Sequence, residues 1–234
     1  MPTVATSNIR NRLAVALDTS DLSTALTIAK EVQPNIGIAK IGLQLFSAAG
    51  HQAVQAMQDI GMTVFLDIKL HDIPNTVLGA SRVIGSLGVR YTTVHAAGGE
   101  AMLRAAVNGL REGATDAGLP TPTALAVTVL TSEPNASPEL LSQRLATAVT
   151  ADCGGIVCAA TDLPIIRQTD PGIVTVVPGI RPAGVPTHDQ GRVATPAEAI
   201  RNGASILVIG RAVTAANDPG SAAEAIAAEV AQVI

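Results

Sequence analysis

Three charged residues of alternating sign stand close together in the segment DIKLHDIPNT at 67–76. Asp67 and Lys69 end the apolar run MTVFL, and Asp72 follows in what we expect to be a loop. Because successive side chains of a strand point to opposite faces, Asp67 and Lys69 should point the same way. Burying a carboxylate beside an ammonium is costly unless each is compensated by the other or by a ligand. The spacing therefore predicts a catalytic site, where a fixed ammonium can stabilise negative charge and deliver a proton.

Eight apolar runs rich in β-branched residues recur along the chain, and we expect each to form a strand. They lie at 12–18, 37–42, 62–69, 89–96, 123–130, 154–160, 173–180 and 205–210. Segments with helical periodicity separate the runs, and several begin with Ser or Thr as a helix cap. The clearest are 22–32, 47–60, 99–118, 137–153 and 195–203. Strands that alternate with helices form a parallel sheet with right-handed crossovers.

The number and character of the runs favour one architecture. Eight units whose apolar runs are continuous rather than alternating predict a closed (β/α)8 barrel of the TIM type, an α/β fold. At 234 residues the chain suits a single barrel domain over 1–234, with a short polar extension at 1–11. An open doubly wound sheet is the alternative, but no G-x-G-x-x-G motif follows the first run.

In such a barrel the chemistry lies at the C-terminal ends of the strands. The polar residues expected there are Asp18, Lys40, Asp67, Lys69, His95, Thr128, Thr131, Arg181, Gly210 and Arg211. Asp18 could instead cap the next helix, and His95 is expected to cap a turn or to pack as a neutral core residue. The order of signs permits a hydrogen-bonded chain through Lys40, Asp67, Lys69 and Asp72.

The last expected strand points to a phosphate site. Gly210 and Arg211 follow it, and this is where barrels commonly hold a phosphate, because backbone N–H groups and a forked guanidinium favour an anion. The loop from Arg181 to Arg192 is rich in Pro and Gly and could act as a lid that brings Gln190 to the same phosphate. The alternative is that Gly210 only ends the strand and that Arg211 lies on the surface.

Composition argues against several classes of protein. With one Tyr, two Phe, no Trp and a net charge of −4, the chain has neither the stacking surfaces nor the basic patch of a nucleic-acid binder. No apolar run approaches 18 residues and the first residues are polar, so we expect a cytoplasmic protein without a membrane segment. Cys153 and Cys158 lack the spacing and histidine partners of a zinc site, and we expect reduced packing thiols.

Eight segments in order resemble the orotidine 5′-phosphate decarboxylase family, bacterial type. They are VALD at 15–18, AKIG at 39–42, FLDIKLHDIPNT at 65–76, VHAAGG at 94–99, AVTVLTS at 126–132, VVPGIRP at 176–182, DQGR at 189–192 and VIGRAVT at 208–214. The resemblance implies a homodimer that converts orotidine 5′-monophosphate into UMP without a metal or an organic cofactor. Gln44, where many members carry Glu, is a minor departure outside the charged residues.

The resemblance also implies a role for each charged residue. Lys69 resembles the proton donor and Asp67 the carboxylate beside the leaving group. Lys40 resembles the lysine that links the ribose to these charges, and Asp18 the contact to a ribose hydroxyl. Asp72 resembles a residue that reaches across the dimer interface into the neighbour's site.

The remaining implied contacts concern the dimer, the base and the phosphate. Thr76 resembles a second residue contributed across the interface. Thr131 matches a residue near the pyrimidine, and Pro178 lies in a segment that passes the ring. The phosphate and lid contacts match Arg181, Gln190, Gly210 and Arg211.

Two other functions remain possible on the sequence. A sugar-phosphate decarboxylase or hexulose-phosphate synthase shares an Asp-x-Lys-x-x-Asp core but uses Mg²⁺, and the HDIPNT and VTVLTS segments argue against it. A nucleotide-binding regulator without activity would not need every charged position to be kept.

Overall fold

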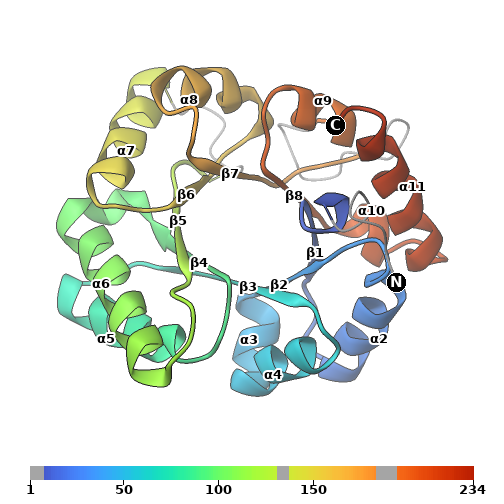
Figure 1. The fold of residues 1–234 in the computed structure, drawn as a ribbon, viewed down its shortest axis with the longest axis horizontal. Coiled ribbons are helices and arrows are strands. Elements are labelled where there is room, and N and C mark those ends of the chain that lie inside the picture. The colour runs from blue at the N-terminus through green and yellow to red at the C-terminus, as the bar shows by residue number, and fades with distance from the viewer. Residues whose placement is uncertain (1–7, 131–136, 183–193) are drawn as a thin grey trace.

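The computed structural model describes residues 8–130, 137–182 and 194–234, and it forms a closed barrel of eight parallel strands (Figure 1). Each strand pairs with the next along the chain, and β1 pairs with β8. The strands are β1 Leu13–Leu17, β2 Ile38–Gly42, β3 Thr63–Leu70, β4 Tyr91–His95, β5 Thr123–Val127, β6 Gly155–Val157, β7 Val174–Val177 and β8 Ile206–Ile209. The predicted (β/α)8 fold is confirmed, and each strand lies within or close to its predicted run.

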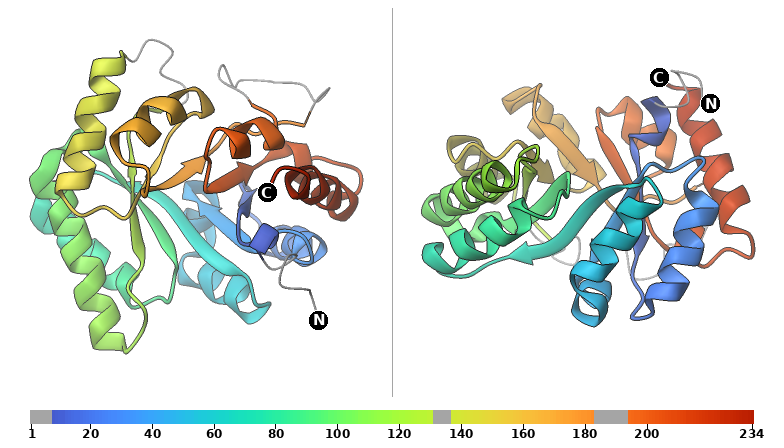
Figure 2. Two further views of the ribbon diagram at one scale, coloured as in Figure 1. Left: turned by 45° about the horizontal axis from the view of Figure 1, so that its top comes forward. Right: turned by 60° about the horizontal axis from the view of Figure 1, so that its bottom comes forward.

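Helices surround the ring of strands, as Figures 1 and 2 show. They are α2 Leu22–Val32, α3 Leu43–Ala49, α4 His51–Asp59, α5 Pro74–Gly85, α6 Gly99–Ala117, α7 Pro138–Thr150, α8 Leu163–Thr169, α9 Pro196–Arg201, α10 Arg211–Thr214 and α11 Pro219–Ala231, with 3₁₀ turns at Ala96–Gly98 and Ala160–Asp162. The helix expected over 47–60 is wrong as a single element, because Gly50 has a φ of 54° and divides it into α3 and α4. Within the described ranges, no helix combines the length and apolar character needed to cross a membrane.

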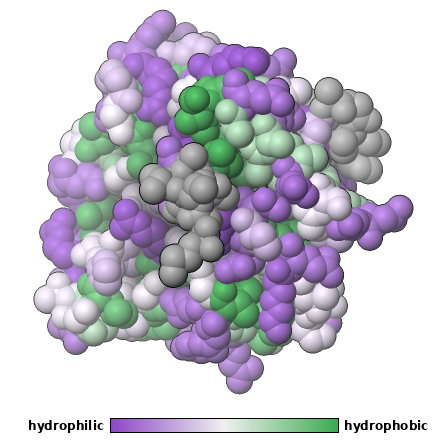
Figure 3. Space-filling model, turned by 45° about the vertical axis from the view of Figure 1, so that its right-hand side comes forward, coloured by the Kyte–Doolittle hydropathy of each residue, from purple (hydrophilic) through white to green (hydrophobic). Residues whose placement is uncertain are grey.

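Both faces of the sheet are buried, as continuous apolar runs predict. A large cluster fills the space between strands and helices and includes Leu13, Val15 and Leu17 of β1. A smaller cluster fills the barrel interior; it consists of Ala14, Ala16, Ile38, Phe65, Leu125, Val176, Ile206 and Val208. On the face shown in Figure 3, hydrophilic side chains cover most of the described surface and hydrophobic ones form smaller groups.

Candidate active site

A cavity of about 440 Å³ opens at the C-terminal ends of the strands. Ala16, Phe65, Val176 and Val208 of the interior cluster contribute to its lining. The predicted site residues that line it are Asp18, Lys40, Asp67, Lys69, Pro178, Arg181, Gly210 and Arg211. The structure thus brings together residues from five segments that are far apart in the sequence.

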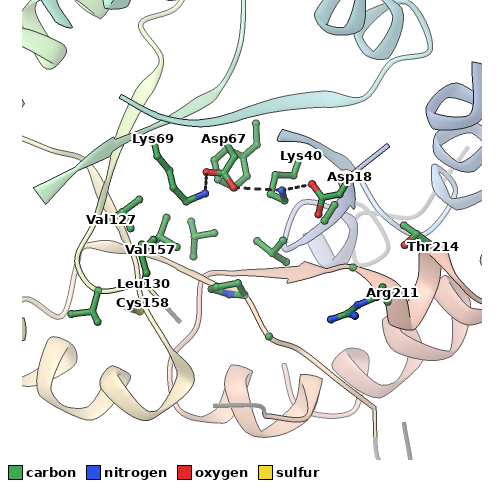
Figure 4. A pocket seen from close by; sticks show the side chains of 18 of the residues that line it. Asp18, Lys40, Asp67, Lys69, Val127, Leu130, Val157, Cys158, Arg211 and Thr214 are labelled. Carbon is green, nitrogen blue, oxygen red and sulfur yellow. Dashed lines mark hydrogen bonds and ion pairs between the residues drawn. The ribbon is translucent and has the colours of Figure 1, made fainter. Parts of the chain in front are cut away.

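Four side chains of alternating charge form a row along one wall of this cavity (Figure 4). Lys69 Nζ lies 2.8 Å from Asp67 Oδ1, Lys40 Nζ lies 3.4 Å from Asp67 Oδ2, and Lys40 Nζ lies 3.2 Å from Asp18 Oδ1. The Asp67 and Lys40 side chains are only 12% and 10% exposed, whereas those of Lys69 and Asp18 are 32% and 59% exposed. The inner pair is therefore fixed by burial, and the outer pair is open to a ligand.

The charges around Asp67 keep it ionised. Burial by itself would raise the pKa of this carboxyl. The ammonium groups of Lys40 and Lys69, with hydrogen bonds from Lys69 and Thr93, outweigh burial and hold the pKa of Asp67 below its ordinary value. The site thus presents a carboxylate between two ammonium groups at neutral pH.

An irregularity of β3 sets the direction of Lys69. Between the register pairs Leu66–Thr92 and Leu70–Val94, β3 has three residues and β4 has only Thr93. Lys69 takes up part of this excess with a φ of 48°, a region that non-glycine residues seldom occupy. The prediction that Asp67 and Lys69 face the same way is confirmed, but a bulge, and not a regular strand, produces it.

Asp18 belongs to the charged row and does not cap the next helix. The cap of α2 is Asp21, whose carboxylate accepts hydrogen bonds from the N–H groups of Ser23 and Thr24. Asp18 fits beside the end of β2 because Gly42 has no side chain there. A Cβ on Gly42 would lie 2.6 Å from Asp18 Oδ1 and 3.2 Å from Lys40 Nζ.

Two arginines line the cavity at the ends of β7 and β8. Arg181 is 7% exposed, and its Nη1 donates to the carbonyl oxygen of Ile180 at 2.8 Å. Its Nε is buried and has no hydrogen-bond partner among the described residues. Burial lowers the pKa of Arg181, and nearby Arg211 lowers it further. Cationic groups crowded in this way favour an anionic ligand.

Apolar residues line the cavity near Lys69 and include Val127, Leu130, Val157 and Cys158. In Figure 4 they lie at the Lys69 end of the row, whereas Arg211 and Thr214 lie towards the Asp18 end. Sequence reasoning missed these apolar residues, since nothing in a valine at a strand end distinguishes a ligand contact from core. The cavity therefore offers a flat apolar wall at one end and cations at the other.

Comparison with known proteins agrees with this geometry. Residues 11–226 match the model of the family described as Orotidine 5′-phosphate decarboxylase / HUMPS family. The chain belongs to this family. Orotidine 5′-phosphate decarboxylase of Anaeromyxobacter dehalogenans is 47% identical over 228 residues, which cover 93% of this chain and 97% of that relative. The enzyme of the same name from Moorella thermoacetica is 44% identical over 236 residues, 96% of this chain and 94% of the relative.

Solved structures with the same family name also share the fold. The crystal structure of orotidine 5′-phosphate decarboxylase from Lactobacillus acidophilus is 33% identical and has a TM-score of 0.79, covering 94% of this chain and 99% of that chain. The corresponding structure from Pyrococcus horikoshii is 25% identical, has a TM-score of 0.75 and covers 93% and 98%. The family assignment therefore holds in both sequence and three-dimensional structure.

Two residues that the family resemblance marked lie apart from the charged row of their own chain. The row begins at Asp18 and ends at Lys69, so the predicted chain through Lys40, Asp67, Lys69 and Asp72 is wrong at its last member. Asp72 is exposed and accepts a hydrogen bond from the N–H of Ile73 at 2.6 Å. Thr76 is exposed on the first turn of α5. Strand β3 ends at Leu70, and both residues lie in the exposed segment that follows it.

Three further predictions have different outcomes. His95 caps a 3₁₀ turn, since its Nδ1 accepts from the N–H of Ala97 at 3.2 Å, and its ring stacks on that of His71. The structural role expected of His95 is confirmed. Thr131 and Gln190, with most of the expected lid, lie outside the described residues.

The alternative Mg²⁺-dependent function requires a set of metal ligands. In the described part of the chain, no three His, Cys, Asp or Glu side chains gather in a way that could hold an ion. The two carboxylates of the charged row are each bound to an ammonium group instead. Cys153 and Cys158 are buried, and burial raises the pKa of the Cys153 thiol to about 12.

Proposed function

We propose that this protein decarboxylates orotidine 5′-monophosphate to UMP and CO2 with no metal or organic cofactor. The observation that carries the proposal is the row Asp18, Lys40, Asp67 and Lys69 on one wall of a cavity that also holds two arginines. The family to which the chain belongs, and relatives of that name at 44–47% identity, support the same reaction.

Lys69 and Asp67 supply the chemistry in this proposal. The bond between C6 of the pyrimidine and its carboxylate breaks, CO2 leaves, and the electron pair remains on C6. No cofactor is required to accept these electrons if a fixed positive charge stabilises them. The ammonium of Lys69 lies 2.8 Å from Asp67 and is the most exposed cation of the row, so it donates its proton to C6 and later recovers one from solvent.

Asp67 holds Lys69 in place and faces the departing carboxylate. Two carboxylates side by side repel each other, and the repulsion is relieved as CO2 leaves. A preorganised field that favours the transition state is the main contribution that we assign to the row, because ion pairs on both sides hold Asp67 between the two lysines.

In this proposal, each remaining group of the substrate lies in the part of the cavity whose polarity matches its own. The pyrimidine lies against the apolar wall near Val127 and Val157, with Pro178 and Thr131 as further contacts. The ribose hydroxyls meet Asp18 and Lys40. The phosphate lies beside Arg181 and Arg211, with the backbone of Gly210 and the side chain of Gln190 as further contacts.

We also propose that two copies of the chain complete each other's sites. All residues from His71 to Thr76 are exposed, and Ile73 is 66% exposed beside the mouth of the barrel. Leu43, which follows the neighbouring strand β2, is 57% exposed. Apolar side chains exposed together favour a protein contact, and a partner placed here would receive Asp72 and Thr76 into its site.

A mixing experiment tests this dimer. Lys69→Ala and Asp72→Ala proteins, each inactive or nearly so, should regain activity when they are mixed and allowed to exchange subunits, because one of the two sites in the hybrid is intact. If no activity returns although hybrid dimers are present, Asp72 acts within its own chain. A monomer in sedimentation experiments would exclude the shared site.

The activity itself is tested with EDTA-treated protein. We expect the absorbance of orotidine 5′-monophosphate to fall and UMP to form, with no change after EDTA. Lys69→Ala should be inactive, and Lys30→Ala, which removes an exposed lysine of α2, should be indistinguishable from the unchanged protein. Activity that EDTA abolishes would favour a Mg²⁺-dependent sugar-phosphate enzyme, and binding of UMP without turnover would favour a regulator.

We also propose that the protein is located in the cytoplasm. Two buried cysteines, Cys153 and Cys158, are in keeping with a reducing compartment. Fractionation of cells with detection of the protein would test it.

A further inference from the structure

Thr93 occupies the gap that the bulge of β3 creates. It is the single residue of β4 that faces Asp67, Ile68 and Lys69 between the two register pairs. Its Oγ1 accepts a hydrogen bond from the backbone N–H of Lys69 at 2.9 Å and donates one to Asp67 Oδ1 at 3.0 Å. One hydroxyl therefore contacts the backbone of one charged residue and the side chain of the other.

The two contacts act on different degrees of freedom. Lys69 has a φ of 48°, a conformation that is unfavourable for a non-glycine residue and persists only where its surroundings enforce it. The bond to Thr93 satisfies the N–H that the irregular register leaves without its usual strand partner. The bond to Asp67 Oδ1 fixes the carboxylate so that Oδ1 faces Lys69 and Oδ2 faces Lys40.

We propose that Thr93 is a positioning residue for decarboxylation, whose hydroxyl holds the Lys69 backbone in its strained conformation and orients Asp67 between the two lysines. This inference rests on the proposed function. Thr93 itself is fully buried and is not among the residues that line the cavity, so it acts through Lys69 and Asp67 and does not touch the substrate.

The neighbouring Thr92 provides a matched control. It lies on the same strand, is 2% exposed, and its Oγ1 has no hydrogen-bond partner within the part of the chain that the structure describes. Thr92→Val and Thr93→Val therefore make the same change in shape at adjacent buried positions. The first removes an unpaired hydroxyl and the second removes two hydrogen bonds to the charged row, so a general effect of a buried Thr→Val change on β4 would appear in both.

The kinetic test compares Thr93→Val, Thr93→Ser and Thr92→Val. We expect Thr93→Val to lower kcat about 10- to 100-fold, the range expected when reacting groups are misplaced by about 1 Å, while KM changes less than threefold because the phosphate contacts remain. Thr93→Ser keeps the hydroxyl and should stay within threefold of the unchanged protein in kcat, as should Thr92→Val. If Thr93→Val does not fold, Thr93→Ser and Thr93→Cys replace it as the pair, and the weaker hydrogen bonding of sulfur should lower kcat about tenfold relative to Ser.

Crystal structures of the variants give a readout that does not depend on turnover. In Thr93→Val or Thr93→Cys we expect Lys69 to leave its positive φ or its Nζ to move away from Asp67 Oδ1, and in Thr92→Val neither change. A kcat of Thr93→Val within threefold of the unchanged protein, an equal loss in Thr92→Val, or an unmoved Lys69 would overturn the proposal. If the unchanged protein does not turn over orotidine 5′-monophosphate, the proposed function fails, and the structures still decide whether Thr93 holds Lys69.

Discussion

A pair of arginines lies at each end of the barrel, and the half-buried pair at one end differs in its partners from the buried Arg181 at the other. At the N-terminal ends of the strands, Arg12 and Arg167 donate to backbone carbonyls that precede β7 and β8. At the C-terminal ends, Arg181 keeps a buried Nε without a partner among the described residues. In both pairs burial lowers the pKa of one arginine and the neighbouring arginine lowers it further. The same residue type is thus satisfied by the protein at one end and left with unused donors at the other.

At the N-terminal ends of the strands, hydrogen bonds within the protein satisfy the half-buried arginines, so no ligand is needed there. Arg167 donates to the carbonyl oxygens of Gly203, Pro171 and Ile173 at 2.6–3.1 Å and to Thr175 Oγ1 at 2.7 Å. Each bond satisfies a carbonyl or hydroxyl where the strands begin, so this end contributes to stability. The other end keeps ammonium and guanidinium groups in position for a substrate, at some cost in stability.

The largest effect should come from the charged row. Lys69→Ala removes the proposed proton donor and the cation nearest the reacting carbon, and we expect kcat/KM to fall at least about 10⁴-fold. Steady-state kinetics with purified protein measure this, with Lys30→Ala as the matched control. A loss of less than about tenfold would remove Lys69 from the mechanism.

At the opposite end, Arg167→Ala should lower stability and leave chemistry unchanged. It leaves several buried carbonyls without a donor, for which we expect a loss of about 3 kcal/mol in the free energy of unfolding, or about 6–12 °C in Tm for a domain of this size. The folded fraction should keep its kcat. Arg201→Ala, which removes an exposed arginine of α9, should change neither the stability nor kcat. A large loss of kcat in folded Arg167→Ala would contradict the claim that the N-terminal end serves stability and not catalysis.

A third effect concerns the phosphate. Arg211→Ala should raise KM roughly 10- to 150-fold, the equivalent of a charged hydrogen bond worth about 1.5–3 kcal/mol. Arg211→Lys should raise KM by less than Arg211→Ala does, because lysine keeps the positive charge but lacks the paired N–H donors of a guanidinium. An unchanged KM in Arg211→Ala would place the phosphate elsewhere, and Arg201→Ala again serves as control.

A smaller effect is expected at Gly42. A Cβ there meets Asp18 Oδ1 at 2.6 Å, and Asp18 is free to shift because its side chain is 59% exposed. Gly42→Ala should therefore fold, with a loss below about 1 kcal/mol, while displacement of Asp18 raises KM roughly fivefold. Gly79→Ala on α5 has open space around its Cβ and should gain up to about 1 kcal/mol with unchanged kinetics. If Gly42→Ala and Gly79→Ala have the same KM, Asp18 does not contact the substrate.

The smallest effect is a dependence of stability on pH. The pKa of Asp67 is lowered in the folded protein, so its contribution to stability is complete above the ordinary carboxyl value of about 3.9 and is lost as the pH falls through the folded value. Urea unfolding of the unchanged protein and of Asp67→Asn should differ most near neutral pH, and the difference should shrink below about pH 4. A difference that grows in acid would contradict the ionised state assigned to Asp67.

The sequence was sufficient for the barrel and for most of the charged row. Strand runs, helical periodicity and polar strand ends are local signals, and Lys40, Asp67 and Lys69 meet at the barrel mouth as the topology requires, although the bulge of β3 and not regular alternation turns Lys69 towards Asp67. Asp18 was placed at the mouth, but its choice between helix cap and site depended on Asp21, which takes the cap in the structure.

The parts that the sequence did not predict depend on register. The shift between β3 and β4 is a relation between two strands, so the positive φ of Lys69 and the role of Thr93 beside it have no local pattern. Asp72 lies outside the charged row of its own chain for a related reason, since β3 ends at Leu70 and Asp72 falls in the exposed segment that follows; the role expected of it across a dimer interface stays a prediction. Arg167 was not recognised either, because its carbonyl partners come from segments distant in the sequence.

The most direct test of the division between the two ends is the free energy of unfolding of Lys69→Ala, measured by urea denaturation beside Arg167→Ala. Lys69 is 32% exposed and Asp67 retains Lys40, so we expect Lys69→Ala to be within about 1 kcal/mol of the unchanged protein, or more stable, although its activity is lost. A loss of about 3 kcal/mol or more, similar to that of Arg167→Ala, would show that the charged row is needed for the fold and would contradict the account.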